Sequence, residues 1–134
     1  MSLFIQNFLL CVLTLLFVQN VLGVRVNVKK SLELGVRVNV TNSLEDNLDL
    51  TIHCKAQGQD LGVHLLHHGD HFSWYFTPSY INLYYCLFQW NDVSHYYDVF
   101  LARRDRSKLC NWYITKSGPC KVLPSGSREC HSWD

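Results

Sequence analysis

Four histidines lie close together in the sequence and are the first candidates for chemistry. They are His64, His67, His68 and His71. On a helix, this spacing would place several imidazoles on one face, where they could hold zinc. Gly69 and Asp70 interrupt any such helix, and an alternating strand pattern begins at His71. We therefore predict separate surface histidines and no metal site, with a weak metal or pH-sensitive site as the alternative.

The serines and carboxylates do not form a catalytic pattern. Ser73 and Ser79 have histidines nearby in the sequence, but no Gly-x-Ser-x-Gly element surrounds either of them. The carboxylates are scattered, and no glycine loop suited to a phosphate is present. The sequence therefore predicts a protein that is not an enzyme, with no cofactor and no small-molecule substrate.

The cysteines predict disulfides. With Cys11 assigned to a cleaved signal, five of the six cysteines remain: Cys54, Cys86, Cys110, Cys120 and Cys130. Several cysteines in a small secreted domain usually form disulfides, and no C-x-x-C spacing suggests zinc. Cys54 and Cys86 occupy inward-facing rows of two expected strands, whereas Cys110 and Cys120 flank a strand and a turn. An odd number leaves one thiol over, for which we choose Cys130, although spacing alone leaves the connectivity open.

The first residues are typical of a secretory signal. The run from Phe8 to Val18 is apolar and uncharged, and it is shorter than the about 20 residues that span a bilayer. Gly23 offers a cleavage site, so residues 1–23 are predicted to be a signal peptide and the protein to be extracellular. A buried N-terminal helix and a retained membrane anchor are the alternatives.

A short tandem repeat follows the predicted signal. The sequence VRVNVKKSLELG (Val24 to Gly35) is followed by VRVNVTNSLEDN (Val36 to Asn47). Each copy alternates as one half-buried strand, and we predict that the second is the structural strand and that residues 24–35 are an extension. Only the second copy holds an N-glycosylation sequon, at Asn39, on the expected outer face.

The rest of the chain predicts strands. Alternating or aromatic runs separated by turn residues recur to about residue 122, and no segment of helical length keeps a 3.6-residue period. We predict an all-β fold, a small disulfide-bonded antiparallel β-sandwich over residues 36–123, followed by a loose C-terminal tail over 124–134.

One cluster of charges suggests a binding surface. Arg103, Arg104, Arg106 and Lys108 follow an expected strand, so they would form a cationic loop that could meet an acidic receptor surface. A merely solvated loop is the alternative, and the segments 57–60 and around Pro78 are further candidates. Across the whole chain 12 Lys and Arg balance 11 Asp and Glu, which predicts no nucleic-acid partner and no direct membrane insertion.

Six motifs in fixed order resemble the plant self-incompatibility protein family, the secreted S-protein homologues. They are VRVNVTNSL (36–44), LTIHCKAQGQDLG (50–62), HHGDHFSWYF (67–76), LYYCLFQW (83–90), HYYDVF (95–100) and CNWYITKSGPC (110–120). The resemblance implies a compact β-sandwich with two disulfides, Cys54 with Cys86 and Cys110 with Cys120. Many relatives carry a cysteine where this chain has Ser107, and Cys130 and the repeat lie outside the family pattern.

The resemblance also implies a function. The best-known members are pistil proteins that act as ligands of a pollen membrane receptor. We therefore expect a secreted protein ligand that binds a cell-surface receptor in pollen–pistil, developmental or defence signalling. The alternative is a secreted antimicrobial or defence protein without a dedicated receptor.

Overall fold

A computed structural model of the chain describes residues 5–14 and 35–133. Residues 5–14 are helical and exposed, and no helix within the two described ranges has the length and apolarity to cross a membrane. Much of the predicted signal and nearly all of the predicted extension, residues 1–4 and 15–34, lie outside the described residues. The second compact unit, which is the folded domain, begins at Gly35.

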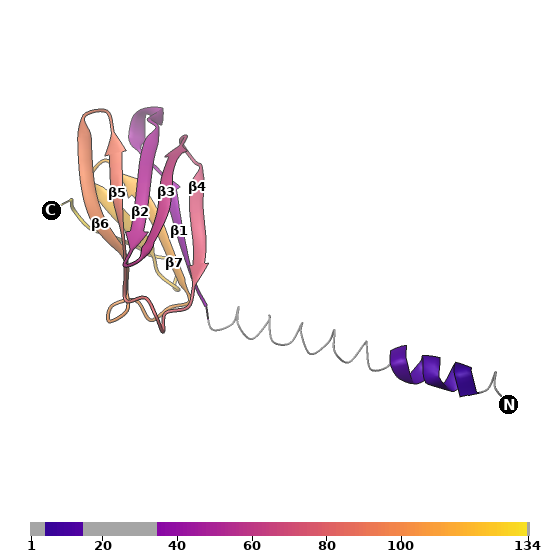
Figure 1. The fold of residues 1–134 in the computed structure, drawn as a ribbon. Helices are drawn as coiled ribbons and strands as arrows, with labels where there is room; N and C mark the ends of the chain where they lie inside the picture. Colours follow the sequence, from indigo (N-terminus) through magenta and orange to yellow (C-terminus); the bar gives the residue numbers. More distant parts are fainter. Residues whose placement is uncertain (1–4, 15–34, 134) are drawn as a thin grey trace. The chain divides into compact units, whose positions relative to one another are not determined.

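The domain consists of strands and one short 3-10 helix. In chain order they are β1 (Val36–Asn42), η1 (Glu45–Asn47), β2 (Leu50–Ala56), β3 (Gln59–Leu66), β4 (His71–Phe76), β5 (Leu83–Trp90), β6 (Val93–Leu101), β7 (Leu109–Thr115), β8 (Gly118–Val122) and β9 (Arg128–Cys130). They form two sheets, which we call sheet A (β4-β1-β7-β8-β9) and sheet B (β3-β2-β5-β6) (Figure 1). The predicted all-β sandwich is confirmed.

One strand pair departs from the predicted antiparallel arrangement. Strand β1 pairs in parallel with β7, while every other pair in the two sheets is antiparallel. Parallel neighbours need a long crossover between them, and all of sheet B together with β4 lies in sequence between β1 and β7. Turn residues between adjacent runs indicate hairpins between strands that are neighbours in sequence. They carry no information about a pairing of strands that are distant in sequence.

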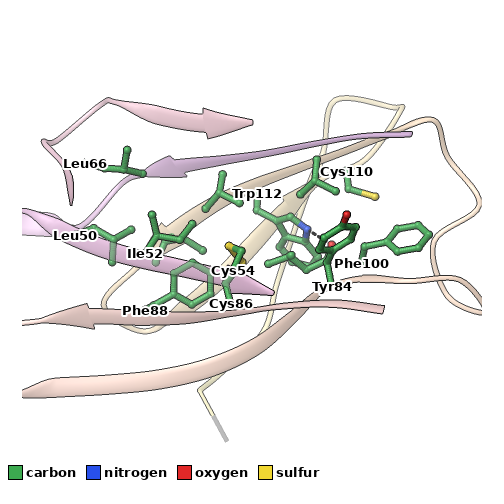
Figure 2. Close-up of a cluster of buried hydrophobic side chains, with 14 of the residues drawn as sticks. Leu50, Ile52, Cys54, Leu66, Tyr84, Cys86, Phe88, Phe100, Cys110 and Trp112 are labelled. Carbon is green, nitrogen blue, oxygen red and sulfur yellow. Dashed lines mark hydrogen bonds between the residues drawn. A yellow bond between two sulfur atoms is a disulfide. The ribbon is translucent and has the colours of Figure 1, made fainter. Parts of the chain in front are cut away.

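Period-two alternation builds the core between the sheets. On β1 the burial alternates, with Val38 and Val40 fully buried, and Trp112 and Phe88 contribute large buried side chains from the two sheets (Figure 2). Trp112 Nε1 donates a hydrogen bond of 2.7 Å to the Val99 carbonyl, so its one polar atom is satisfied. Each fully buried side chain of this size contributes about 1.5–3 kcal/mol.

The second repeat copy forms β1, as predicted, and Asn42 explains why this copy fits. Its carboxamide is fully buried, donates to the carbonyls of Leu48 (2.8 Å) and Leu66 (2.9 Å), and accepts from the amide of Leu44 (2.9 Å). The corresponding residue of the first copy is Lys30. A lysine ammonium at the Asn42 position would be buried without a charged partner, which is costly.

The prediction of a loose C-terminal tail over residues 124–134 was wrong. Strand β9 pairs with β8, and Trp133 beyond it is only 8% exposed. The Trp133 ring stacks on His95 of β6 at 4.7 Å, and its Nε1 donates to the carbonyls of Thr115 and Lys116. Polar and turn-forming residues dominate the segment in the sequence, but one tryptophan and one cysteine are enough to attach it.

The disulfides confirm one predicted pair and correct the other. Cys54 and Cys86 lie directly opposite each other on β2 and β5 and are bonded in the core, whereas Cys120 bonds Cys130 rather than Cys110. Cys110 points into the core with Trp112, while Cys120 is opposite Tyr113 and therefore lies on the outer face of sheet A. Side chains on opposite faces of a sheet cannot form a disulfide, so the sequence proximity was misleading.

Candidate functional site

The three segments predicted as candidate contact regions meet at one end of the sandwich. This end, which we call the loop end, comprises the turn at 57–58, the loops 77–82 and 102–108, and the turn 123–127. The amide of Ala102 donates to the carbonyl of Asn82 at 2.9 Å, which ties two of the loops together. Segments far apart in the sequence therefore lie together at one end of the sandwich (Figure 1).

The loop 102–108, which we call the basic loop, carries four cationic side chains. Three of them have no salt bridge among the described residues, and the fourth binds a carboxylate. Arg103, Arg106 and Lys108 are exposed, and none forms a salt bridge with any residue in the ranges 5–14 and 35–133. Arg104 bonds the carboxylate of Asp105 through Nη2 at 2.7 Å and the carbonyl of Asp98 at 2.8 Å. The structure thus places three of the four predicted contact residues outward as unpaired charges and uses the fourth to hold the loop.

Asp105 anchors this loop to the body of the domain, and the sequence analysis did not single it out. Its side chain has no exposed surface. It accepts hydrogen bonds from Lys121 of β8 (2.6 Å), from the Leu101 amide (2.8 Å) and from Arg104. Burial alone would raise the pKa of this carboxyl, but the three donors outweigh burial and hold the pKa below its ordinary value. The loop is therefore fixed by a buried, fully bonded carboxylate.

A shallow hollow adjoins the basic loop. Its volume is about 280 Å³, and its lining residues are Ala56, Gln57, Tyr80, Ile81, Asn82, Leu83 and Tyr85. The Tyr80 side chain is 90% exposed. Tyrosine and arginine are among the residue types enriched at the energetic centres of protein interfaces, and the loop end presents both.

The four histidines do not converge. His64 stacks on Phe72 at 4.0 Å and bonds the Leu61 carbonyl at 2.8 Å, while His67 bonds Asp49. His68 bonds the Leu44 carbonyl, and His71 is exposed. Within the described ranges no group of three or more His, Cys, Asp or Glu side chains is placed to hold a metal ion.

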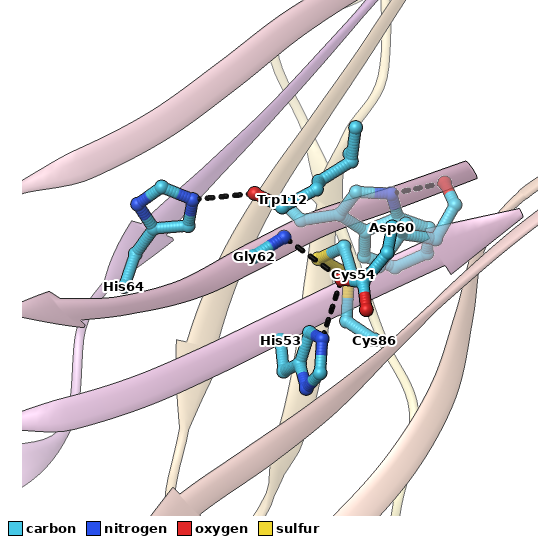
Figure 3. Close-up of a disulfide and its surroundings, with 9 residues drawn as sticks. His53, Cys54, Asp60, Gly62, His64, Cys86 and Trp112 are labelled. Carbon is cyan, nitrogen blue, oxygen red and sulfur yellow. Dashed lines mark hydrogen bonds and ion pairs between the residues drawn. A yellow bond between two sulfur atoms is a disulfide. The ribbon is translucent and has the colours of Figure 1, made fainter.

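A fifth histidine lies on sheet B beside the internal disulfide. His53 Nε2 bonds Asp60 Oδ1 at 2.6 Å, and the Gly62 amide donates to the same oxygen at 2.9 Å (Figure 3). These two bonds lower the pKa of Asp60. The pair supports the bulged hairpin of β2 and β3.

The possible nucleophiles are not activated. Cys110 is unbonded, and burial raises the pKa of its thiol to about 11, so the reactive thiolate is scarce at neutral pH. Ser73 Oγ accepts a hydrogen bond from Arg37 at 3.4 Å rather than facing a base, and Ser79 is exposed.

The predicted sequon lies on the outer face of sheet A. Asn39 is half-buried on β1, and its Nδ2 donates to Asn111 Oδ1 at 2.9 Å. Thr41 follows on the same face, as its alternation with the buried Val40 predicts. Glycosylation of Asn39 stays a prediction.

Known proteins similar to this chain come from one family. Residues 37–133 match the family model described as plant self-incompatibility protein S1. S-protein homolog 20 of Arabidopsis thaliana is 34% identical over 94 residues, which cover 66% of this chain and 68% of that protein. S-protein homolog 29 of the same plant is 39% identical over 91 residues, covering 63% and 67% respectively.

Proposed function

This chain belongs to the plant self-incompatibility protein S1 family, and we propose that it is a secreted extracellular ligand that binds a cell-surface receptor protein. Its role is signalling between or to plant cells, in pollination, development or defence. It acts by binding rather than by catalysis. The family membership, the disulfides and the apolar N-terminal run support this proposal.

The observation that carries the proposal is the group of unpaired cations at the loop end. Arg103, Arg106 and Lys108 are exposed and have no acidic partner among the described residues. The acidic residue within the loop, Asp105, is buried and occupied by Arg104 and Lys121. The remaining charges are free to steer an acidic receptor surface toward the loop end.

Anchoring makes this surface suitable for recognition. A loop that is ordered before binding loses less conformational entropy when it binds. Asp105 fixes the middle of the basic loop, and the Ala102–Asn82 bond fixes its start.

The test uses the purified, oxidised protein on live plant cells, with crosslinking and identification of the captured membrane proteins. The variant Arg103→Ala/Arg106→Ala/Lys108→Ala should capture the same receptor at least tenfold less efficiently. The control is Lys116→Ala, which removes a cation at the opposite end of the sandwich, where Lys116 pairs with Asp46. Equal capture by the triple variant would remove the loop end from the proposal. Absence of any specific cell-surface target would favour a secreted defence protein that acts without a receptor.

A further inference from the structure

The outer face of sheet B carries a row of side chains across its four strands that is apolar except at His53 on β2, and we call it the apolar row. Register places Val63 opposite His53, His53 opposite Leu87, and Leu87 opposite Tyr96, and Figure 1 shows the four strands side by side. Val63 is 64% exposed, Tyr96 is 68% exposed, and Leu65, two residues after Val63 on β3, is 59% exposed. Solvent-facing positions of an antiparallel sheet are usually polar, so this row has no role in the fold that would explain it.

The outer face of sheet A is different. Its β1 positions hold Arg37 and Asn39, and Asn39 bonds Asn111 across the parallel pair. Arg37 lies over the ring of Tyr75, and Arg128 lies over Tyr113. Polar and charged groups therefore occupy much of this face, beside the exposed Tyr75 and Leu109, and the predicted glycan would lie on β1.

The apolar row is continuous with the loop end through Tyr85. Tyr85 lines the hollow at the loop end, lies next to Leu87 on the outward side of β5, and its ring centroid is 6.3 Å from that of Tyr96. Charges flank the row on this side, at Lys55 and Asp98, which share the register of Tyr85. An apolar centre with a polar rim is the usual anatomy of a protein interface.

We propose that the receptor contact extends from the loop end over the outer face of sheet B, so that the receptor presents an acidic patch beside an apolar patch. This proposal rests on the proposed function and names the second half of its surface. The free cations of the loop end attract the acidic patch of the receptor. The apolar patch of the receptor packs against the row of Val63, Leu87 and Tyr96, together with Leu65.

Size favours the receptor over a second copy of this chain as the occupant. Four strands about 4.8 Å apart and about 20 Å long give a face of about 400 Å². A stable interface covers about 800 Å² on each partner. The face of sheet B alone is therefore too small for a stable dimer, so a partner that binds it stably must also contact the neighbouring loop end.

The two halves of the surface should affect different rate constants. Exposed charges mainly set the association rate and its dependence on salt, whereas buried apolar contacts mainly set the dissociation rate. Replacing the apolar row should therefore shorten the lifetime of the complex and leave its salt dependence unchanged.

The experiment measures association and dissociation of labelled protein on live plant cells at two salt concentrations. Val63→Ser/Tyr96→Ser should dissociate at least tenfold faster than the unmodified protein. The matched control is Tyr75→Ser on the outer face of sheet A, where Tyr75 is 59% exposed, and it should dissociate at the unmodified rate. Thermal unfolding of both variants verifies that they fold, as expected for exposed positions.

Three results would overturn the inference. If Val63→Ser/Tyr96→Ser dissociates normally while Arg103→Ala/Arg106→Ala/Lys108→Ala fails to associate, the proposed function stands and the extension to sheet B falls. If the unmodified protein binds no cells, both fall together. If sedimentation shows a dimer of the unmodified protein that Val63→Ser/Tyr96→Ser dissociates, the occupant of this face is a second copy.

Discussion

The two ends of the sandwich are built in different ways. At the end opposite the loop end, which we call the closed end, the buried Asn42 side chain makes three hydrogen bonds and Trp133 stacks on His95. A hydrogen bond between His67 and Asp49 and an ion pair between Lys116 and Asp46 add to it. At the loop end, Asp105 is the anchor, and the neighbouring cations point outward without acidic partners among the described residues.

The difference shows where this fold concentrates its stabilising polar contacts. Hydrogen bonds at the closed end connect the side chains of Asn42 and Trp133 to backbone carbonyls, and such bonds satisfy polar groups in and near the core. Charges at the loop end contribute little to stability and are available to a partner. Substitutions at the closed end should therefore change stability, and substitutions at the loop end should change binding.

Asp105 is an exception to this division, because it lies at the loop end but is expected to affect stability. Asp105→Ala leaves Arg104 and Lys121 partly buried without their carboxylate, so we expect a loss of about 4 kcal/mol in the free energy of unfolding. Chemical denaturation measures it, with Asp98→Ala on the exposed side of β6 as the control. A loss below about 1 kcal/mol would show that the loop end has no buried anchor.

Trp133→Ala should have the next largest effect, about 3 kcal/mol, because it removes a buried aromatic ring that contacts both sheets. Tyr80→Ala, which removes a tyrosine 90% exposed at the loop end, should change stability by less than about 0.5 kcal/mol. Equal effects of the two changes would contradict the contrast between the ends. The measurement is thermal or denaturant unfolding of the oxidised protein.

Asn42→Ala should lower stability by about 2 kcal/mol, because the carbonyls of Leu48 and Leu66 and the amide of Leu44 lose their partner. Asn82→Ala is the matched change at the loop end, where Asn82 is exposed, and should be nearly neutral. Hydrogen exchange of the Leu44 amide reports the loss directly. Unchanged protection of that amide in Asn42→Ala would count against the role assigned to Asn42.

Acid should destabilise the protein through Asp105. Its folded-state pKa lies below the ordinary value, so its contribution is present above the unfolded-state pKa of about 3.9 and is lost as the pH falls through the folded-state value. Stability measured from pH 6 downward should therefore fall below about pH 4. Asp105→Asn should remove part of this dependence, and an identical pH profile in the variant would assign the acid sensitivity to other carboxylates.

Neutralising the free cations should have the smallest effect on stability. Arg103→Ala/Arg106→Ala/Lys108→Ala should change the free energy of unfolding by no more than about 0.5 kcal/mol. The same variant should associate more slowly with plant cells, with a weaker dependence on salt. A large loss of stability would mean that these side chains belong to the scaffold and not to a contact surface.

Alternation in the sequence predicted much of this architecture. The runs containing Ile52, Phe88 and Trp112 indicate strands with one buried face, and burial in the structure follows them. Alternation specifies the face of a residue within its own strand, but it does not specify which distant strand is the neighbour. For this reason the parallel pairing of β1 with β7 could not be predicted.

The residues that organise the candidate surface were harder to predict. Asp105 stands in a run of arginines and resembles an ordinary surface residue, because its second donor, Lys121, lies on another strand. The same limit applies to Cys120, whose partner could be identified only when its outward orientation was known. One sequence signal does indicate an attached C-terminus: Cys130 and Trp133 are residue types that are usually buried or bonded.

The parallel pairing of β1 with β7 also affects the order in which the sheet forms. During synthesis β1 emerges first, yet one of its two neighbours, β7, emerges only after all of sheet B has been made. Pairings so distant in sequence form late. In a chain entering the secretory pathway, Asn39 would thus stay accessible to the glycosylating enzyme throughout that interval, although it becomes half-buried in the finished sheet. The order in which the sheet closes, and not the exposure of Asn39 in the folded protein, would then decide whether the sugar is added.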